Sequence, residues 1–130
     1  MNKRTKVLVV DDDPLIRDIL QRIFKDLGMD AVTASDGSQA GEKLKANIDE
    51  LAIAVIDLVL PGGVTGWDLI EDWKKNKITA DIPLVAITGA HLSDREFDKL
   101  NRRTDAIIKK QDFGIEDFKE KISNLLGHQH

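Results

Sequence analysis

Residues 7–14 read VLVVDDDP and contain the transition on which the fold depends. Four consecutive apolar residues rich in valine are typical of a strand that is buried on both faces, as in a parallel sheet. Three aspartates follow at once, and Asp13 directly precedes Pro14, an order that predicts a helix cap and then the first helical position. The stretch therefore predicts a buried strand that passes through an acidic turn into a helix.

The same alternation continues to the end of the chain. Between the apolar blocks, apolar residues recur at every third or fourth position, which indicates amphipathic helices. Gly28 is expected to close the first helix, and residues 35–37 (SDG) are expected to form a turn before the second. Five β-α units of this kind predict an α/β fold, a doubly wound parallel sheet with helices on both faces. The further apolar blocks lie at residues 31–34, 52–56, 84–87 and 106–108.

The composition is that of one ordinary soluble domain. The chain has 130 residues, 42% of them hydrophobic, a formal net charge of -4 and no cysteine, which excludes disulfides, a thiolate zinc site and a cysteine nucleophile. Without a concentrated basic face, direct nucleic-acid binding is not expected. No apolar run is long enough for a membrane span or a signal peptide, so we expect a cytoplasmic protein with no membrane partner. We expect residues 1–130 to form one domain, with its core at about 5–127.

Polar side chains follow four of the five expected strands, where a doubly wound sheet binds its ligands. Carboxylates about 5 Å apart repel one another by about 3 kcal/mol per pair at an effective dielectric of 20, which a proton or a cation must relieve. Carboxylates with strand-end carbonyls suit Mg²⁺, and a hydroxyl and an ammonium suit a phosphoryl group. The polar groups are Asp11, Asp12 and Asp13 after the first strand, Asp57 after the third, Thr88 after the fourth, and Lys109 and Lys110 after the fifth.

Each of these residues also has an ordinary structural explanation. Asp13 is expected to cap a helix rather than to bind a ligand, because it precedes Pro14. A threonine at a strand end is commonly a turn hydroxyl, and adjacent lysines are commonly a solvated edge. Their coincidence at the carboxyl ends of parallel strands favours a site, and Asp57, which stands alone on its strand, is the expected nucleophile.

With these residues in place, the sequence resembles the receiver domain of two-component response regulators along nearly its whole length. The resemblance implies the flavodoxin-like form of the sheet, with strand order 2-1-3-4-5. The similar motifs are the acidic opening at 9–14 (VVDDDP), the second β-α unit at 33–37 (TASDG), the phosphoacceptor segment at 57–62 (DLVLPG), the threonine strand at 83–88 (PLVAIT) and the lysine strand at 105–110 (DAIIKK).

The resemblance also implies the chemistry. Asp57 would accept a phosphoryl group from the phosphohistidine of a sensor histidine kinase or a phosphotransfer protein. Asp12, Asp57 and the Val59 carbonyl would ligate Mg²⁺, and Asp11 would act through a metal-bound water. The domain would be a signalling switch and not an enzyme, since it catalyses only its own phosphorylation and dephosphorylation.

Thr88 and one lysine would bind the phosphoryl oxygens. Counting back along the family's lysine strand favours Lys110, with Lys109 as the alternative. Because side chains alternate along a strand, the two lysines point to opposite faces and only one can serve. Gln111 stands where the family usually has a proline, which leaves this choice open.

Other departures from the family pattern bear on signalling. Ile107 replaces the usual aromatic residue, so a signal must pass through Thr88 and the loop that follows it. The loop after Asp57 is one residue longer than the commonest form, a variant associated with receivers of hybrid histidine kinases. Val59 and Ala90 are apolar at the two positions that tune phosphate lifetime, which predicts a long-lived phosphoaspartate.

The resemblance places an output face at residues 94–126, for an output domain, a downstream protein or a homodimer partner. The acidic and basic residues that alternate in the first part of this segment are explained equally well by a solvated surface. The kinase is expected near the start of the first helix, at Leu15, Ile16 and Arg17, although Leu15 or Ile16 must also cover the sheet. Two functional alternatives stay open: a degenerate receiver that docks partners without phosphorylation, and a haloacid-dehalogenase-like phosphatase built on Asp11 and Asp13, against which Leu15 and the short chain weigh.

Overall fold

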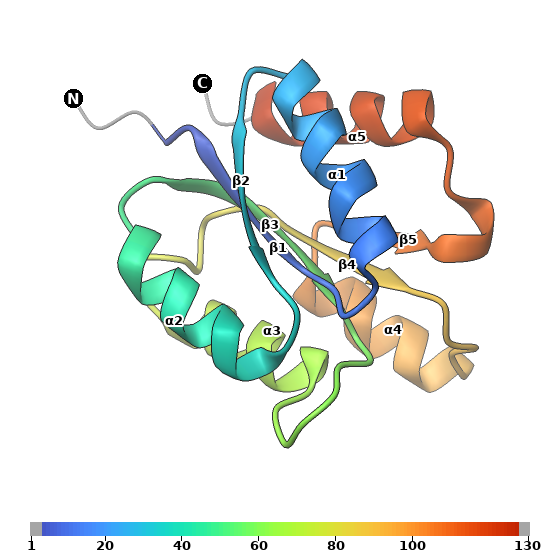
Figure 1. Cartoon of the computed structure of the whole chain (residues 1–130). Helices are drawn as coiled ribbons and strands as arrows, with labels where there is room; N and C mark the ends of the chain where they lie inside the picture. Colours follow the sequence, from blue (N-terminus) through green and yellow to red (C-terminus); the bar gives the residue numbers. More distant parts are fainter. Residues whose placement is uncertain (1–3, 128–130) are drawn as a thin grey trace.

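The computed structural model describes residues 4–127 and shows a five-stranded sheet between two layers of helices (Figure 1). Neighbouring strands are all parallel, and their order is β2-β1-β3-β4-β5. The predicted fold class is confirmed, and the expected core at 5–127 lies inside the described range. Residues 1–3 and 128–130 of the expected domain lie outside it. The strands are β1 (Lys6–Val10), β2 (Asp30–Ala34), β3 (Leu51–Asp57), β4 (Leu84–Thr88) and β5 (Ala106–Lys109).

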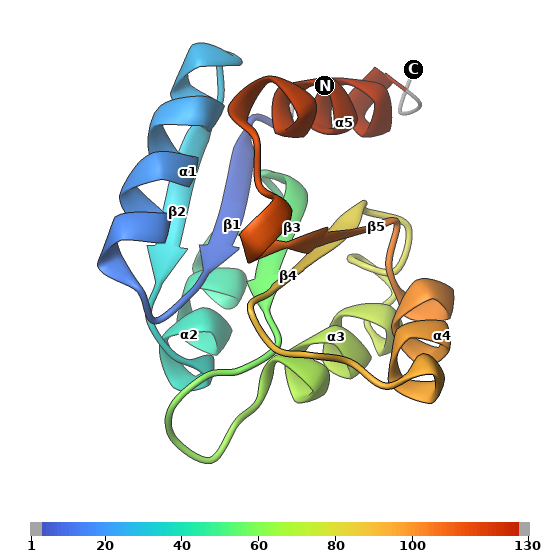
Figure 2. The same cartoon turned by 90° about the vertical axis from the view of Figure 1, so that its right-hand side faces the viewer.

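Helices cover both faces of the sheet (Figures 1 and 2). α1 and α5 pack on one face through residues such as Phe24 and Phe118, whose rings meet edge to face at 5.8 Å. α2, α3 and α4 pack on the other face, where Trp73 and Leu100 are buried. The helices are α1 (Pro14–Asp26), α2 (Gly37–Asn47), α3 (Gly66–Lys75), α4 (Asp94–Arg103) and α5 (Ile115–Gly127), with a short 3-10 helix η1 (Lys110–Asp112) after β5.

In the central strands β1, β3 and β4 the buried residues are apolar up to the carboxyl ends, where the polar residues begin. All seven residues of β3 are buried, and Asp57 is the last of them. Alternate side chains of β1 enter the two cores, with Val7 and Val9 on one side and Leu8 on the other. Burial on both faces is what a continuous apolar run predicts.

Local capping follows the predicted signals. The Asp13 carboxylate accepts a hydrogen bond from the Leu15 amide at 2.9 Å, and Pro14 begins α1. Gly28 follows the end of α1 with φ of 81°, a left-handed conformation that favours glycine. Asp36 caps α2 through a bond of 2.8 Å from the Gln39 amide. The expectations for Asp13 and Gly28 are confirmed, whereas the expected turn at 35–37 is one residue shorter, because Gly37 is already the first residue of α2.

The loop between β3 and α3 is held close to the strand end. A Cβ atom on Gly66 would overlap the carbonyl oxygen of Asp57, and the Gly66 amide donates to the Leu58 carbonyl at 3.1 Å. A Cβ on Gly37, at the start of α2, would overlap the Val64 side chain. The two glycines therefore allow the loop to pack against β3 on one side and α2 on the other.

Two side-chain contacts join α3 to α4. The Lys99 ammonium lies over the Trp67 ring, 5.2 Å from its centroid, and Arg103 pairs with Glu71 at 3.1 Å. Trp73, which follows Trp67 on α3, is buried and donates its indole N–H to the Ile82 carbonyl at 3.0 Å.

Between residues 4 and 127, no helix has both the length and the apolar character needed to cross a membrane.

Candidate functional site: an acidic pocket at the carboxyl edge of the sheet

Three aspartates meet where β1 and β3 end. β1 and β3 are neighbours, so Asp11, which follows β1, lies beside Asp57 at the end of β3. Both are buried, with 0% and 3% of their surface exposed, whereas Asp12 is exposed. One carboxylate oxygen from each of the three lies within 4.8 Å of the others. In the described part of the chain this is the only such group of acidic or histidine side chains.

Lys110 is the lysine that reaches these carboxylates. η1 begins immediately after β5 and turns Lys110 toward β1 and β3, so that its Nζ lies 3.0 Å from an oxygen of Asp57 and 3.0 Å from one of Asp11. Lys109 instead lines a hollow on the α4 side of β5. The structure therefore brings Lys110 together with the carboxylates. The side chains of Lys109 and Lys110 point to opposite faces of the sheet, as expected.

Burial dominates the electrostatics of Asp11. Desolvation raises the pKa of Asp11, and the nearby Asp57 charge adds to that increase, while bonds from the Asp13 amide and Lys110 oppose it. Burial alone would lower the pKa of Lys110, but its hydrogen bonds to Asp57 and Asp11 outweigh burial and raise it. The pocket thus keeps its ammonium charged while one of its carboxylates carries a desolvation cost.

One oxygen in this pocket has no hydrogen bond. Asp11 Oδ1 accepts from the Asp13 amide at 2.9 Å, but Oδ2 is buried and accepts none from residues 4–127, although Lys110 Nζ lies 3.0 Å away. Buried carboxylates are paired with a positive charge or coordinate a metal, and the charged partner of Asp11 in this structure is the Lys110 ammonium. The donor set of three carboxylates therefore fits a hard divalent ion such as Mg²⁺.

Thr88 and Val59 complete the set that the sequence predicts. Thr88 is fully buried at the end of β4, and its hydroxyl oxygen accepts a hydrogen bond from the Ala90 amide at 3.0 Å. The Val59 amide donates to Asp57 at 3.1 Å, and its side chain is 62% exposed. Thr88 therefore lies on the strand next to that of Asp57, and its hydroxyl is bonded to the loop that follows β4.

Two residues support the pocket in ways that the sequence does not reveal. Arg17 donates a hydrogen bond from Nη1 to the backbone carbonyl of Asp11 at 2.7 Å. Gly66 lets the start of α3 approach the Asp57 carbonyl. The sequence analysis places Arg17 at the kinase-facing start of the first helix and Gly66 in a loop. It does not predict these two contacts, because both depend on the tertiary arrangement.

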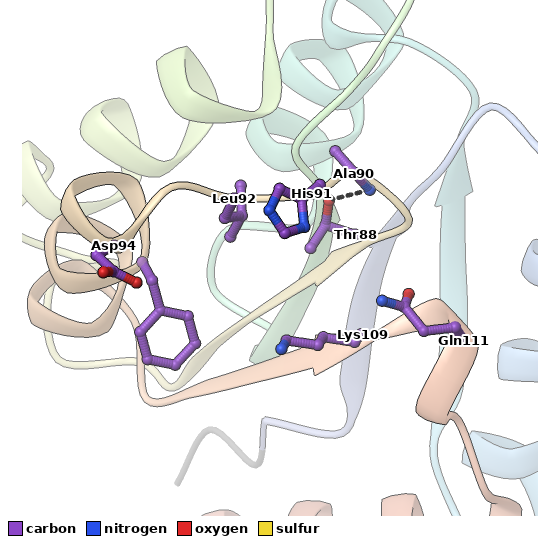
Figure 3. A pocket seen from close by; sticks show the side chains of 8 residues that line it. Thr88, Ala90, His91, Leu92, Asp94, Lys109 and Gln111 are labelled. Carbon is purple, nitrogen blue, oxygen red and sulfur yellow. Dashed lines mark hydrogen bonds between the residues drawn. The ribbon is translucent and has the colours of Figure 1, made fainter.

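A hollow of about 340 Å³ lies on the other side of Thr88, between the loop after β4, α4 and β5. Figure 3 shows Thr88, His91 and Leu92 facing Lys109 across it. Phe97, which the apolar pattern of α4 places in the core, instead lines this hollow and is 38% exposed, because Leu100 alone fills the buried face of α4. The hollow joins the loop after β4 to the face expected at residues 94–126, which contributes Asp94, Phe97, Lys109 and Gln111 to its lining.

Comparison with known proteins identifies the family of the chain. The response regulator receiver domain family matches residues 7–123. The chain is 35% identical over 100 residues to the alkaline phosphatase synthesis transcriptional regulatory protein PhoP of Bacillus subtilis (strain 168), over 77% of this chain and 38% of that protein. It is 28% identical over 123 residues to the gliding motility regulatory protein of Myxococcus xanthus, over 95% of this chain and 15% of that protein.

Solved structures share the fold as well. A response regulator receiver domain protein (CheY-like) from Methanospirillum hungatei JF-1 superposes with a TM-score of 0.81 at 26% identity, over 96% of this chain and 95% of that chain. The fold and the acidic pocket define a two-component signalling domain with a flavodoxin-like sheet. The chain belongs to the response regulator receiver domain family. It spans only 15% and 38% of the two curated relatives named above.

Proposed function

We propose that Asp57 is the phosphoacceptor and that Asp11, Asp12, Asp57 and the Val59 carbonyl hold Mg²⁺ beside it. The observation that carries this proposal is the pairing of a nearly buried Asp57 with the Lys110 ammonium at 3.0 Å, at the edge of the sheet where two further carboxylates converge. An ammonium and a cation site around one carboxylate neutralise the charge that a phosphoryl group brings.

The chain's own residues account for the transfer. An oxygen of Asp57 attacks phosphorus, and the phosphorus–nitrogen bond of a partner's phosphohistidine breaks as the new phosphorus–oxygen bond forms. Lys110 binds a phosphoryl oxygen, from the position where it now pairs with Asp57. The Thr88 hydroxyl accepts from Ala90, so its own proton is free for a second phosphoryl oxygen. Mg²⁺, when bound, supplies positive charge to the carboxylates and to the transferred group.

Phosphorylation would then shift an equilibrium between two forms of the domain. A ligand shifts populations only if it prefers one form. Thr88 supplies that preference here, because a bond from its hydroxyl to the phosphoryl group acts on the loop that Ala90 ties to it. This loop borders the hollow and α4, so residues 94–126 are the surface that a downstream protein, an output domain or a second copy would read.

The proposed phosphoryl donor is a sensor histidine kinase or a phosphotransfer protein in the cytoplasm. Leu15 at the start of α1 is 63% exposed, while Ile16 packs against the core shared by α1 and α5. Leu15 is therefore not needed to cover the sheet. An exposed leucine beside the acidic pocket supports docking of the donor at this end of α1.

The test is incubation with acetyl phosphate and Mg²⁺, followed by intact mass measurement of the native chain and of Asp57→Asn. We expect one phosphoryl adduct on the native chain that requires Mg²⁺ and is absent from Asp57→Asn. The matched control is Asp18→Asn, which changes an exposed carboxylate on α1 and should leave the adduct unchanged.

Other results would point to the alternatives. A folded native chain without an adduct would favour a receiver that docks partners without phosphorylation. An adduct that persists in Asp57→Asn would move the acceptor to Asp11 or Asp13 and support the phosphatase alternative.

The phosphoaspartate should be long-lived. Val59 is exposed beside Asp57 but has no polar atom in its side chain to orient an attacking water, and Ala90 has none either. We expect decay over minutes or longer, measured by loss of the adduct mass after removal of acetyl phosphate. Val59→Asn should shorten the lifetime several-fold. A native half-life of seconds would contradict this expectation.

A further inference from the structure

Arg17 reaches back from α1 to the turn that carries the aspartates. Its Nη1 donates to the Asp11 carbonyl at 2.7 Å, and its backbone amide donates to the Asp13 carbonyl at 3.1 Å. We propose that Arg17 is a positioning residue that holds the Asp11 backbone and so aligns Asp11 and Asp12 for a divalent cation. This inference rests on the proposed function, because it concerns the same cation site.

The Asp11 carbonyl needs a partner because it lies outside the sheet yet is fully buried. β1 ends at Val10, and the Asp11 amide makes the last bond of that strand, to the Ala34 carbonyl at 3.1 Å. Asp11 has 0% of its surface exposed, so water cannot satisfy its carbonyl. No backbone amide among residues 4–127 donates to it, and Arg17 fills that role.

The bond also decides where the Asp11 carboxylate points. With the amide held by Ala34, the carbonyl by Arg17 and Oδ1 by the Asp13 amide, only Oδ2 is left without a hydrogen bond. That atom is part of the pocket beside Lys110. Removing the Arg17 bond would free one of three fixed points and would leave a buried carbonyl that turns toward another donor or toward water.

Arg17 has a second, opposite effect through its charge. A guanidinium at the Asp11 turn repels a cation bound there, so a neutral side chain at position 17 would strengthen cation binding if charge alone mattered. If positioning matters more, the neutral side chain weakens binding. Lysine keeps the charge but has a single ammonium in place of the planar guanidinium, so it separates the two effects.

The experiment is titration calorimetry of the full, unphosphorylated chain with MgCl₂, comparing the native protein with R17M, R17K and R22M. Arg22 is the matched control: it lies on the same helix and makes only an exposed ion pair with Asp18. We expect R17M to raise the dissociation constant for Mg²⁺ about ten-fold, the lower end of the loss seen when a residue that orients metal ligands is removed. The dissociation constant of R17K should lie between those of the native chain and R17M, and that of R22M should equal the native value.

Hydrogen exchange supplies a readout that does not involve the metal. The Asp13 amide bonds to Asp11 Oδ1, so its exchange reports on the order of the turn. In metal-free buffer we expect it to exchange about ten-fold faster in R17M than in the native chain, with the Leu20 amide in the middle of α1 unchanged. A uniform increase along α1 would indicate a general loss of stability and would overturn the positioning role.

The remaining outcomes are equally decisive. A folded R17M that binds Mg²⁺ as tightly as the native chain, or more tightly, would overturn the inference but leave the cation site intact. If R17M does not fold, R17K decides: an unchanged dissociation constant together with faster exchange of the Asp13 amide would show that the turn can loosen without affecting Mg²⁺, and it would overturn the inference. A native chain that binds no Mg²⁺ would overturn the proposed cation site and this inference together.

Discussion

The two edges of the sheet contain the same contact in different surroundings. At the amino edge, Lys6 lies 3.0 Å from Glu50, and their side chains are 29% and 51% exposed. At the carboxyl edge, Lys110 lies 3.0 Å from Asp57, with side chains 23% and 4% exposed. An exposed pair contributes at most about 1 kcal/mol, whereas a buried carboxylate must be paired because it has lost its water. Burial, and not distance, therefore distinguishes a surface contact from a binding site.

The largest expected effect comes from crowding at the carboxyl edge. Gly66→Ala places a Cβ on the Asp57 carbonyl, and backbone must move to relieve it. We expect the free energy of unfolding to fall by about 3 kcal/mol, measured by urea denaturation. Gly41→Ala in α2 meets nothing within 4 Å and should instead raise it by about 0.5–1 kcal/mol. A loss below about 1 kcal/mol in Gly66→Ala would show that this edge is not tightly packed.

Exchanging the two lysines for methionine tests the comparison directly. In metal-free buffer, Lys110→Met should lower the free energy of unfolding by about 2 kcal/mol, less than for a fully buried pair because Lys110 keeps some exposure. Lys6→Met should change it by less than about 0.5 kcal/mol. Because the pKa of Lys110 is raised above 10.5, its contribution is complete below that pH and is lost as the pH rises through the higher value in the folded state. Equal losses of unfolding free energy in the two variants would show that burial does not distinguish the two ion pairs.

A substitution at Asp11 is expected to change the free energy of unfolding by a smaller amount and to raise it. Its raised pKa means that the folded state disfavours its charge, so Asp11→Asn should raise the free energy of unfolding by about 1 kcal/mol at pH 7 without metal. The gain should be absent at low pH, where the carboxyl is protonated in both states, and should grow as the pH rises above 3.8. Thermal unfolding at several pH values measures it. Destabilisation at pH 7 would show that the Lys110 contact outweighs desolvation.

The sequence predicts the fold because its signals are local. Apolar runs, the Asp13 cap and the Gly28 stop each depend on a few neighbouring residues, and each is found in the structure. The polar residues at strand ends are predicted for the same reason, since parallel strands bring their carboxyl ends to one edge.

What the sequence leaves open depends on distant contacts. The choice between Lys109 and Lys110 depends on how η1 turns, and the sequence has no proline there to indicate it. The bond from Arg17 to a backbone carbonyl involves an atom that every residue has, so no side-chain pattern indicates it. Phe97 follows a helical apolar pattern, yet its exposure depends on how α4 sits against β5.

The contact between Lys99 and Trp67 gives the protein an optical property. Trp73 is buried and hydrogen-bonded, so its fluorescence forms a constant background. Trp67 follows Gly66 at the Asp57 end of α3, and the Lys99 ammonium over its ring belongs to α4. Any change in the distance between α3 and α4 alters the field at that indole and shifts its emission. The domain thus contains an intrinsic fluorescent reporter between its acidic pocket and α4, the first helix of its proposed output surface.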